Sequence, residues 1–284
     1  MKIRSLILSI IWVGLLFPLA SGGPGQAQDF QSSPIYRELV QAGFEIVETG
    51  VRYGVPYVEI VIPEGMSISY LCREIPTLKR DFLIARKKIA FFNSLNPFYI
   101  KSEDPEPYSI ETDTLKIPLD LSREPEIFPK VDESLAHYGQ YILVDIGKGY
   151  LALYEEGELK RVFPVSAGRG RRTPLFAFRV QKKIESHYST KYDAWMPWAL
   201  MLRRPYYAHG GVLPGTDDSA GCIRLFVEDA RELFHLVEVG TPGRIVRSRP
   251  EEAGAPAPTA QGDKSFPTQA RRGFPAASPR PEWR

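Results

Sequence analysis

Short segments rich in apolar residues in the second half of the chain have the pattern of β-strands, and apolar and polar positions alternate in the first of them. Three such segments follow one another at residues 141–146, 150–154 and 159–165. Turns that contain glycine, at residues 147–149 and 155–158, separate them. Short strands joined by tight turns form an antiparallel meander, so this region is predicted to be mainly β.

The first half has a different pattern, in which strand-like and helix-like segments are mixed. Two strands and two helices are predicted, at residues 57–62, 68–75, 82–93 and 115–118. This order predicts a small α+β module over about residues 57–120, inside an N-terminal region of residues 28–130. Residues 122–132 contain Pro125 and Pro129 and are predicted to be a linker.

A further amphipathic helix is predicted at residues 225–237, where the apolar positions share one face. Its stripe consists of Leu225, Phe226, Ala230, Leu233, Phe234 and Val237. Cys222 comes just before this segment, so we expect it at a helix N-terminus. Unpaired amide groups at such a terminus stabilise a thiolate.

The two ends of the chain differ from the rest. Residues 1–27 resemble a secretory signal peptide, with Lys2 and Arg4 followed by an apolar run from Leu6 to Ala20. The run is shorter than the ~20 residues of a spanning helix, so cleavage is favoured over a retained anchor. Either alternative predicts an exported protein of the periplasm or cell envelope. Residues 248–284 are rich in Pro, Ala, Gly, Ser and Arg, and are predicted to be a disordered tail.

Composition narrows the function only slightly. Hydrophobic residues make up 43% and charged residues 25% of 284 residues, as in ordinary globular proteins. A net charge of +2 gives no general case for a nucleic-acid partner. The two cysteines cannot form a disulfide framework, although a single Cys72–Cys222 disulfide is an alternative in an exported protein. We favour a buried, free Cys72.

The strongest chemical signal is the segment HGGVLPGTDDSAGCIR, residues 209–224. It brings His209 and Cys222 within fourteen positions in a chain with four histidines and two cysteines. A thiol becomes a good nucleophile as its thiolate, and a nearby imidazole can take the proton. Gly221 allows a tight backbone turn next to the thiol. The alternative is a buried thiol and a packed imidazole without catalytic roles. A Cys–His pair alone cannot fill a zinc site, so no metal is expected.

The flanking residues favour catalysis. The pattern H-G, then S-x-G-C-x-R, resembles the catalytic signature of the L,D-transpeptidases, bacterial enzymes that cross-link peptidoglycan. The resemblance covers about residues 138–247 and includes four further segments: Ser166-Ala167-Gly168, Thr173-Pro174, Met196-Pro197-Trp198-Ala199 and Gly240-Thr241-Pro242. It implies a β-rich catalytic domain with a short helix after the cysteine. Two departures are Phe176, where the family has glycine, and Ala220, where many members have histidine.

The resemblance also implies roles for single residues. Cys222 would be the nucleophile and His209 the base, with the backbone carbonyl of Gly210 orienting the imidazole. The amides of Gly221 and Cys222 would form the oxyanion hole. Substrate contacts or loop anchoring are expected from five residues: Arg171, Trp198, Tyr207, Ser219 and Arg224. Asp217 and Asp218 are expected to be exposed. No cofactor is implied.

The function implied is cysteine acyl transfer from a peptidoglycan tetrapeptide stem to an amine. The acceptor is another stem, which gives a 3-3 cross-link, or a lipoprotein or D-amino acid. Such a role belongs to cell wall biogenesis and the maintenance of cell shape. The alternatives are a thioester hydrolase acting on the same stems and a non-catalytic wall-binding protein. In a papain-like protease the cysteine precedes the histidine, the reverse of the order here.

The module at residues 57–120 is similar to the lysin motif, a small carbohydrate-binding module. The similarity is carried by Val61, Gly65, Ser67, Ile68, Leu71, Asn93 and the strand at 115–118. It implies glycan strands as a partner, and the alternative is a supporting domain that packs on the catalytic one.

Overall fold

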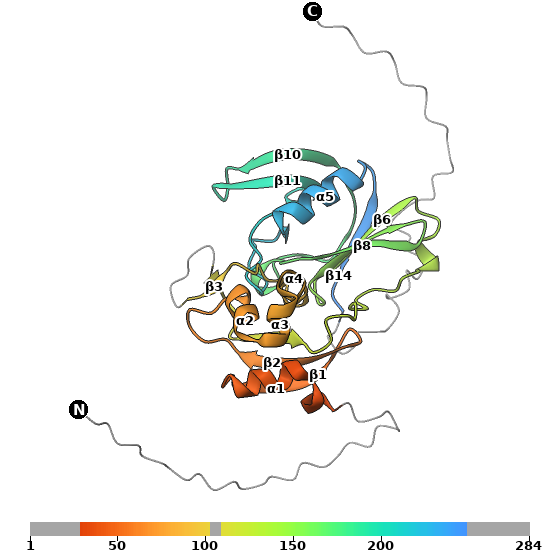
Figure 1. Cartoon of the computed structure of the whole chain (residues 1–284). Helices are drawn as coiled ribbons and strands as arrows, with labels where there is room; N and C mark the ends of the chain where they lie inside the picture. Colours follow the sequence, from red (N-terminus) through yellow and green to blue (C-terminus); the bar gives the residue numbers. More distant parts are fainter. Residues whose placement is uncertain (1–28, 103–108, 249–284) are drawn as a thin grey trace, which may run out of the picture.

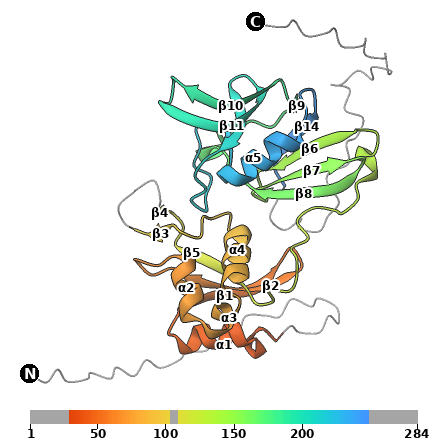
Figure 2. The ribbon, with the colours of Figure 1, turned by 45° about the horizontal axis from the view of Figure 1, so that its top comes forward.

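The computed structural model describes residues 29–102 and 109–248. The predicted signal peptide at residues 1–27 lies outside this range, as does the predicted tail apart from Ser248. Figures 1 and 2 show two parts side by side: an N-terminal module, coloured red to yellow, and a C-terminal domain, coloured green to blue. Within the described residues, no helix combines the length and apolar character that crossing a bilayer requires.

The N-terminal module is built on a three-stranded antiparallel sheet with the order β1-β2-β5. The strands are β1 (Ile46–Arg52), β2 (Val55–Val61) and β5 (Thr114–Pro118). Four helices accompany the sheet (Figure 1): α1 (Pro34–Gln41), α2 (Ile68–Glu74), α3 (Pro76–Arg80) and α4 (Phe82–Phe92). The predicted order of strand, helices and strand is confirmed by β2, α2, α4 and β5. Strand β1 was not predicted because most of its side chains are exposed, so no apolar alternation marks it.

Short elements complete the module and its exit. The structure has the 3-10 helix η1 (Phe30–Ser32) and a two-stranded parallel pair, β3 (Ile100–Lys101) and β4 (Ser109–Ile110). A second 3-10 helix, η2 (Glu133–Leu135), follows the predicted linker. Ile127 and Phe128 of that linker are buried, so it packs against its surroundings.

The C-terminal domain contains a five-stranded sheet with the order β8-β7-β6-β14-β9. Its strands are β6 (Gln140–Asp145), β7 (Tyr150–Glu155), β8 (Glu158–Pro164), β9 (Ala177–Arg179) and β14 (Pro242–Val246). The predicted meander is confirmed by the antiparallel pairs β6–β7 and β7–β8. Strand β14 joins β6 in parallel, which brings the end of the domain back to its beginning.

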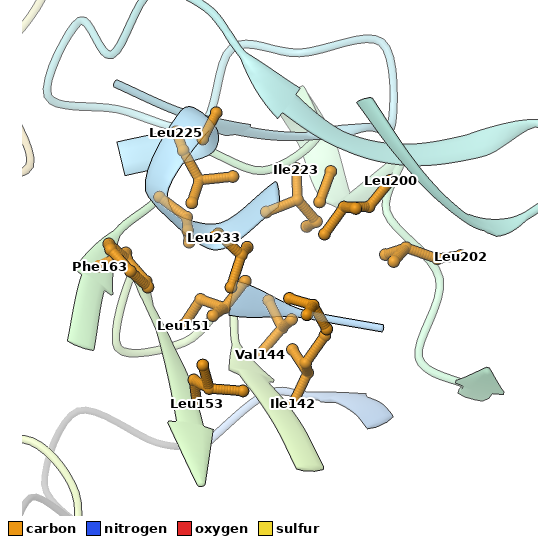
Figure 3. Packing of buried hydrophobic residues seen from close by; sticks show 14 of the residues in the cluster. Ile142, Val144, Leu151, Leu153, Phe163, Leu200, Leu202, Ile223, Leu225 and Leu233 are labelled. Carbon is orange, nitrogen blue, oxygen red and sulfur yellow. The ribbon is translucent and has the colours of Figure 1, made fainter. Parts of the chain in front are cut away.

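A four-stranded sheet, β10-β11-β12-β13, forms the other layer. It consists of β10 (Lys182–Ser189), β11 (Ala194–Arg203), β12 (Tyr206–Gly210) and β13 (Ile223–Leu225). Helix α5 (Val227–Leu236) packs on β11 and β12. The apolar side chains of both sheets and α5 meet in one core, shown in Figure 3. The predicted mainly β class is therefore confirmed.

One prediction about this layer is wrong. Helix α5 begins at Val227, and the residues before it form strand β13. Ile223 and Leu225 are buried while Arg224 between them is partly exposed, which is a strand pattern of period two. Cys222 therefore precedes a strand, and a helix N-terminus does not stabilise its thiolate.

Two tyrosines form contacts between the N-terminal module and the C-terminal domain. The hydroxyl of Tyr150 donates to the Phe91 carbonyl at 2.9 Å, and the Tyr53 hydroxyl donates to the Lys148 carbonyl at 3.2 Å. The rings of Tyr53 and Tyr150 meet edge to face with centroids 5.8 Å apart. Because these tyrosines belong to one buried cluster with the linker residues Ile127 and Phe128, the parts share a core.

Candidate active site

Strands β12 and β13 run side by side in parallel, and the segment between them contains the predicted catalytic residues. His209 pairs with Arg224, and Ala208 pairs with Ile223. Extending this register by one residue sets Cys222 beside Tyr207, and the Cys222 side chain does pack against Tyr207. Paired residues on neighbouring strands point to the same face, as do residues two positions apart. His209 and Cys222 therefore share one face of the sheet.

His209 is buried, with 7% of its surface exposed. Its Nδ1 lies 2.8 Å from the Gly210 carbonyl oxygen. When Nδ1 carries the proton it donates to this carbonyl, which leaves Nε2 free to accept a proton. Burial lowers the pKa of His209 to about 4; the bond to Gly210 opposes this change, and the nearby charges of Arg224 and His187 add to it. The imidazole is therefore neutral near pH 7.

Cys222 is a free, partly buried thiol. It packs against a small apolar cluster formed by Met196, Ala199 and Tyr207. Burial raises the pKa of the Cys222 thiol, whereas the Tyr207 backbone bond and the Arg224 charge lower it. Because the net direction is upward, the resting pair is a neutral thiol with a neutral imidazole. Attack then requires that the proton leave the sulfur as it reacts.

Cys72 is also free and lies in the core of the N-terminal module. Burial raises the pKa of its thiol to about 12. The expectation of a buried, free Cys72 is confirmed, and the alternative disulfide is not formed in this structure.

A tight turn leads into Cys222. The Ser219 hydroxyl donates to the Cys222 carbonyl at 2.6 Å and accepts from the Gly221 amide at 3.0 Å. Gly221 has φ +137°, and an added Cβ would come within 3.1 Å of Tyr206 and 3.2 Å of the Arg172 carbonyl. Only glycine fits this conformation and this space.

The same bonds correct the expected role of Gly221. Its amide donates to Ser219, so it is not available as an oxyanion donor in this arrangement. Gly221 instead shapes the turn, and the Cys222 amide is the remaining candidate from the predicted pair. The buried Thr173 also stabilises the turn. Its hydroxyl donates to the Gly221 carbonyl at 2.9 Å and accepts from the Gly168 amide at 2.8 Å.

Arg224 anchors the segment before the turn. Its guanidinium lies 3.2 Å from the Asp218 carboxylate, which also pairs with Arg169. Asp217 accepts a hydrogen bond from the Ala167 amide at 2.8 Å. The expectation that Asp217 and Asp218 are exposed is therefore wrong, since both are partly buried and tie their loop to the segment after β8.

The other three residues that were predicted to contact the substrate lie in separate parts of the domain. Tyr207 lies in the apolar cluster beside Cys222. Arg171 is exposed, in the 3-10 helix η3 (Arg169–Arg171). The Trp198 ring packs edge to face on Phe234 of α5, with centroids 5.4 Å apart.

Two residues of the site could not be recognised from the sequence. His187 stacks on Tyr207 with centroids 4.8 Å apart, close enough for its charge to act on His209. It came from a polar stretch without a motif, and the pairing of β10 with β11 is what brings it here. Thr173 was seen only as part of a Thr-Pro pair. Its burial and its two bonds to glycine backbones could not be read from the sequence.

The loop between β12 and the turn is held by the N-terminal module. Leu95 forms a backbone bridge with Pro214, and the Glu111 amide donates to the Pro214 carbonyl at 3.3 Å. The Thr216 hydroxyl donates to the Glu111 carboxylate at 3.3 Å. Val212 packs against the core of the module. We name residues 211–218 the clamped loop, because contacts from another domain fix the segment that leads to Ser219 and Cys222.

Across residues 29–102 and 109–248, no three His, Cys, Asp or Glu side chains converge as metal ligands would.

Comparison with known proteins agrees with this arrangement. Residues 139–245 match the family model of the YkuD domain, described as an L,D-transpeptidase catalytic domain. A search of curated protein sequences gave no match.

Similar solved structures include L,D-transpeptidases from three bacteria. The Stackebrandtia nassauensis enzyme is 24% identical, with a TM-score of 0.38, and the match covers 43% of this chain and 60% of that one. The Xylanimonas cellulosilytica protein is 23% identical, with a TM-score of 0.38, and the match covers 46% of this chain and 67% of that one. L,D-transpeptidase 1 of Mycobacterium tuberculosis is 23% identical, with a TM-score of 0.33, and the match covers 38% of this chain and 61% of that one. The match thus spans about two thirds or less of the length of these relatives.

The family match spans β6 to β14, and so includes the β12–β13 pair, the turn at Gly221 and the core in Figure 3. The chain therefore carries a YkuD-type L,D-transpeptidase catalytic domain over residues 139–245.

Proposed function

We propose that the protein is a peptidoglycan L,D-transpeptidase of the cell envelope that works through a Cys222 acyl-enzyme. The observation that carries the proposal is the 2.8 Å contact of His209 Nδ1 with the Gly210 carbonyl, on the face that Cys222 shares. This contact orients the ring and selects the tautomer, so a carboxylate partner is not required.

The chemistry follows from neutral reactants. Cys222 Sγ attacks the carbonyl carbon of the stem peptide while His209 Nε2 takes the thiol proton. The tetrahedral intermediate collapses with cleavage of the C–N bond, and the imidazolium returns its proton to the leaving amine, the terminal D-alanine. An acceptor amine then attacks the thioester and restores the thiol. The Cys222 amide is the donor best placed for the oxyanion.

The surroundings of Cys222 favour transfer over hydrolysis. Met196, Ala199 and Tyr207 cover the sulfur with apolar surface, which limits the approach of water to a thioester. An amine carried by a peptide can bring its own apolar contacts. A hydrolase acting on the same stems is the second candidate, because the acylation half-reaction is identical.

Intact-protein mass spectrometry after incubation with a carbapenem tests the nucleophile. We expect a covalent adduct on the wild type and on Cys72→Ala, and none on Cys222→Ala. An adduct that survives in Cys222→Ala, or no adduct on folded, reduced wild type, contradicts the proposal.

A second assay separates transfer from hydrolysis. A tetrapeptide stem is incubated with and without a D-amino acid, and the products are counted by mass spectrometry. Exchange of the terminal residue in excess over the tripeptide product supports transfer. Accumulation of tripeptide at the same rate under both conditions identifies a hydrolase.

A further inference from the structure

A cavity of about 280 Å³ lies between the N-terminal module and the clamped loop. The module contributes the end of β1, the residues around Asn93, and β5 with the residues before it. The C-terminal domain contributes the β6–β7 turn and residues 215–217 of the clamped loop. Its charged and hydroxyl lining includes Arg52, Glu59, Lys116, Lys148, Thr216 and Asp217. The lining of this cavity is mainly polar and includes the apolar residues Ile146 and Val165.

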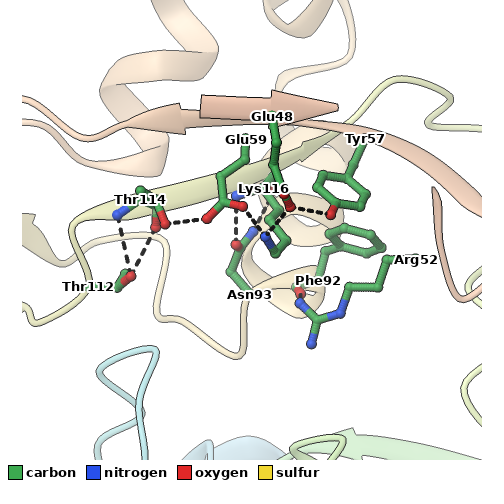
Figure 4. Close-up of polar contacts among 9 residues, drawn as sticks. All are labelled: Glu48, Arg52, Tyr57, Glu59, Phe92, Asn93, Thr112, Thr114 and Lys116. Carbon is green, nitrogen blue, oxygen red and sulfur yellow. Dashed lines mark hydrogen bonds and ion pairs between the residues drawn. The ribbon is translucent and has the colours of Figure 1, made fainter. Parts of the chain in front are cut away.

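Most of the charges in the cavity already have partners. Lys116 pairs with the Glu59 carboxylate and, at 3.4 Å, with Glu48, as Figure 4 shows. Asp217 accepts the Ala167 amide, and Lys148 Nζ donates to the Ile127 carbonyl at 2.8 Å. These contacts hold the walls of the cavity in place without any ligand.

Arg52 is held by a backbone carbonyl and two aromatic rings, and not by a carboxylate of this network. Its guanidinium lies 5.0 Å from the ring centroid of Tyr53 and 5.6 Å from that of Phe92, and Nη1 donates to the Phe92 carbonyl at 3.3 Å. None of the ion pairs found among residues 29–102 and 109–248 includes Arg52. In Figure 4 its guanidinium points away from the Glu48–Lys116 network. A partly buried guanidinium with five donors is thus fixed at the cavity with no carboxylate partner.

The backbone sets the direction in which the Arg52 side chain leaves its strand. It ends β1, and the following turn has two residues in the left-handed region, Tyr53 (φ 54°) and Gly54 (φ 75°). This is the tight turn that suits a two-residue hairpin. The Tyr53 hydroxyl then donates to the Lys148 carbonyl in the other domain. The direction of Arg52 is therefore fixed by the hairpin and by the contact between domains.

We propose that this cavity is a binding site for a small carboxylate ligand, a free amino acid or the end of a short peptide, held by Arg52. A planar guanidinium binds a carboxylate through two parallel hydrogen bonds. Arg52 takes part in no ion pair among the described residues, so a ligand with a single negative charge would be its counter-ion. Glu59 and Asp217 disfavour a doubly charged phosphate. The hydroxyls of Thr112, Thr114 and Ser94 also line the cavity; each already donates within the protein, so each can only accept from the ligand, for example from an ammonium group.

Binding here would reach the candidate active site through the clamped loop. Residues 215–217 line the cavity and lead directly to Ser219 and Cys222. A ligand that bridges Arg52 and this loop would add a contact between the domains. This consequence rests on the proposed function, whereas the binding site itself does not.

Isothermal titration of the full chain tests the site. The probes are D-alanine, L-alanine, the dipeptide of alanine, acetate and inorganic phosphate. We expect saturable binding of an alanine or of the dipeptide, weakened about tenfold or more in Arg52→Gln, since a charge-assisted hydrogen-bonded pair is lost. Binding of free alanine, or of the dipeptide alone, identifies which source of the carboxylate fits.

Two variants serve as controls. Arg37→Gln removes an exposed arginine of the same module outside the cavity and should bind as the wild type does. Arg52→Lys keeps the charge but loses the two parallel hydrogen bonds, so we expect intermediate affinity. This variant also tests the site if Arg52→Gln folds poorly. No saturable binding by any carboxylate probe overturns the proposal. So does binding that is unchanged in both Arg52 variants, or binding of phosphate in preference to the carboxylates.

The same titration on Cys222→Ala separates this inference from the proposed function. Carboxylate binding that depends on Arg52 in that variant supports the cavity even if carbapenem acylation of the wild type fails.

Discussion

His209 and Cys222 are both buried enough to be neutral, and this determines how the site can work. A thiolate–imidazolium pair formed in advance would need a raised imidazole pKa and a lowered thiol pKa. The directions here are the opposite for both groups. Proton transfer must therefore accompany attack on the substrate, with the Gly210 carbonyl stabilising the imidazolium as it forms.

The pH dependence of acylation follows from this arrangement. The base is active while His209 is neutral, and its pKa lies at about 4. We expect the carbapenem acylation rate to persist down to about pH 5 and to fall near pH 4. An acid limb centred near 6.5, the value of an unperturbed histidine, would contradict a buried base.

The same histidine should make stability depend on pH. Its folded pKa is depressed, so between about pH 6.5 and 4 the unfolded chain binds a proton that the folded chain does not. Protonation then favours unfolding, and stability falls as pH decreases through this window, by up to ~3 kcal/mol from this group. Asp229 acts in the opposite sense, since burial raises its pKa to about 6.

Chemical denaturation at several pH values, on wild type and His209→Gln, isolates the histidine contribution. The difference in the free energy of unfolding between the two proteins should change with pH in this window. A constant difference would show that His209 titrates normally in the folded state.

Gly221 supports the site through shape alone, which allows a sharp substitution. Gly221→Ala places a Cβ against Tyr206 and the Arg172 carbonyl, in a backbone conformation with φ +137°. We expect a loss of ~1–3 kcal/mol in stability and a clear drop in acylation rate, because the turn must shift. The matched control is Gly240→Ala, which also has positive φ but no atom within 4 Å of the new Cβ. Equal acylation rates for the two variants would show that the turn tolerates a side chain.

At the scale of helices and strands, some elements could be predicted from the sequence and others could not. Strands β6, β7 and β8 could be predicted because each is a short run with apolar residues and tight turns separate them, although β6 and β7 are buried along almost their whole length and do not alternate. Strand β13 has three residues, and its apolar positions also fit the start of α5, so the sequence alone did not separate them. The cysteine and histidine could be predicted from their motif. The neighbours His187 and Thr173 could not, since strand pairing and a buried turn bring them to the site.

The contact between the clamped loop and strand β13, formed by Asp218 and Arg224, can be tested with a single substitution. Asp218 joins Arg224 of β13 to Arg169 beyond β8, so Asp218→Asn loosens the end of the clamped loop. We expect a several-fold fall in acylation rate with a stability change of ~1 kcal/mol or less, as is usual for partly exposed pairs. Glu232→Gln, which breaks an exposed pair with Arg161, is the control. A slower rate in both variants would point to a general electrostatic effect.

For the whole molecule, the aromatic cluster between the domains implies that neither part is independent. Removing residues 1–121 takes away Tyr53 and Phe91, which pack on the fully buried Tyr150, and frees the clamped loop from Leu95 and Glu111. We expect the remaining fragment to be less stable and to react much more slowly with a carbapenem. Circular dichroism shows whether it stays folded, and mass spectrometry gives the rate.

Truncation after Ser248 is the comparison for this deletion. Ser248 hydrogen bonds to Asp145 and should be kept. This shorter chain should react with soluble substrate as the full chain does. An N-terminal deletion that reacts equally fast would show that the loop holds its shape unaided.

The clamped loop also bears on how such a chain could have evolved. A carbohydrate-binding unit joined by a flexible tether can be exchanged for another without harm to its enzyme. Here the backbone of Leu95 and Glu111 is bonded to the strand-to-strand connection that bears the nucleophile. Chimeras that combine this catalytic domain with a foreign module should therefore lose activity unless the residues facing Pro214 and Thr216 are transplanted with it.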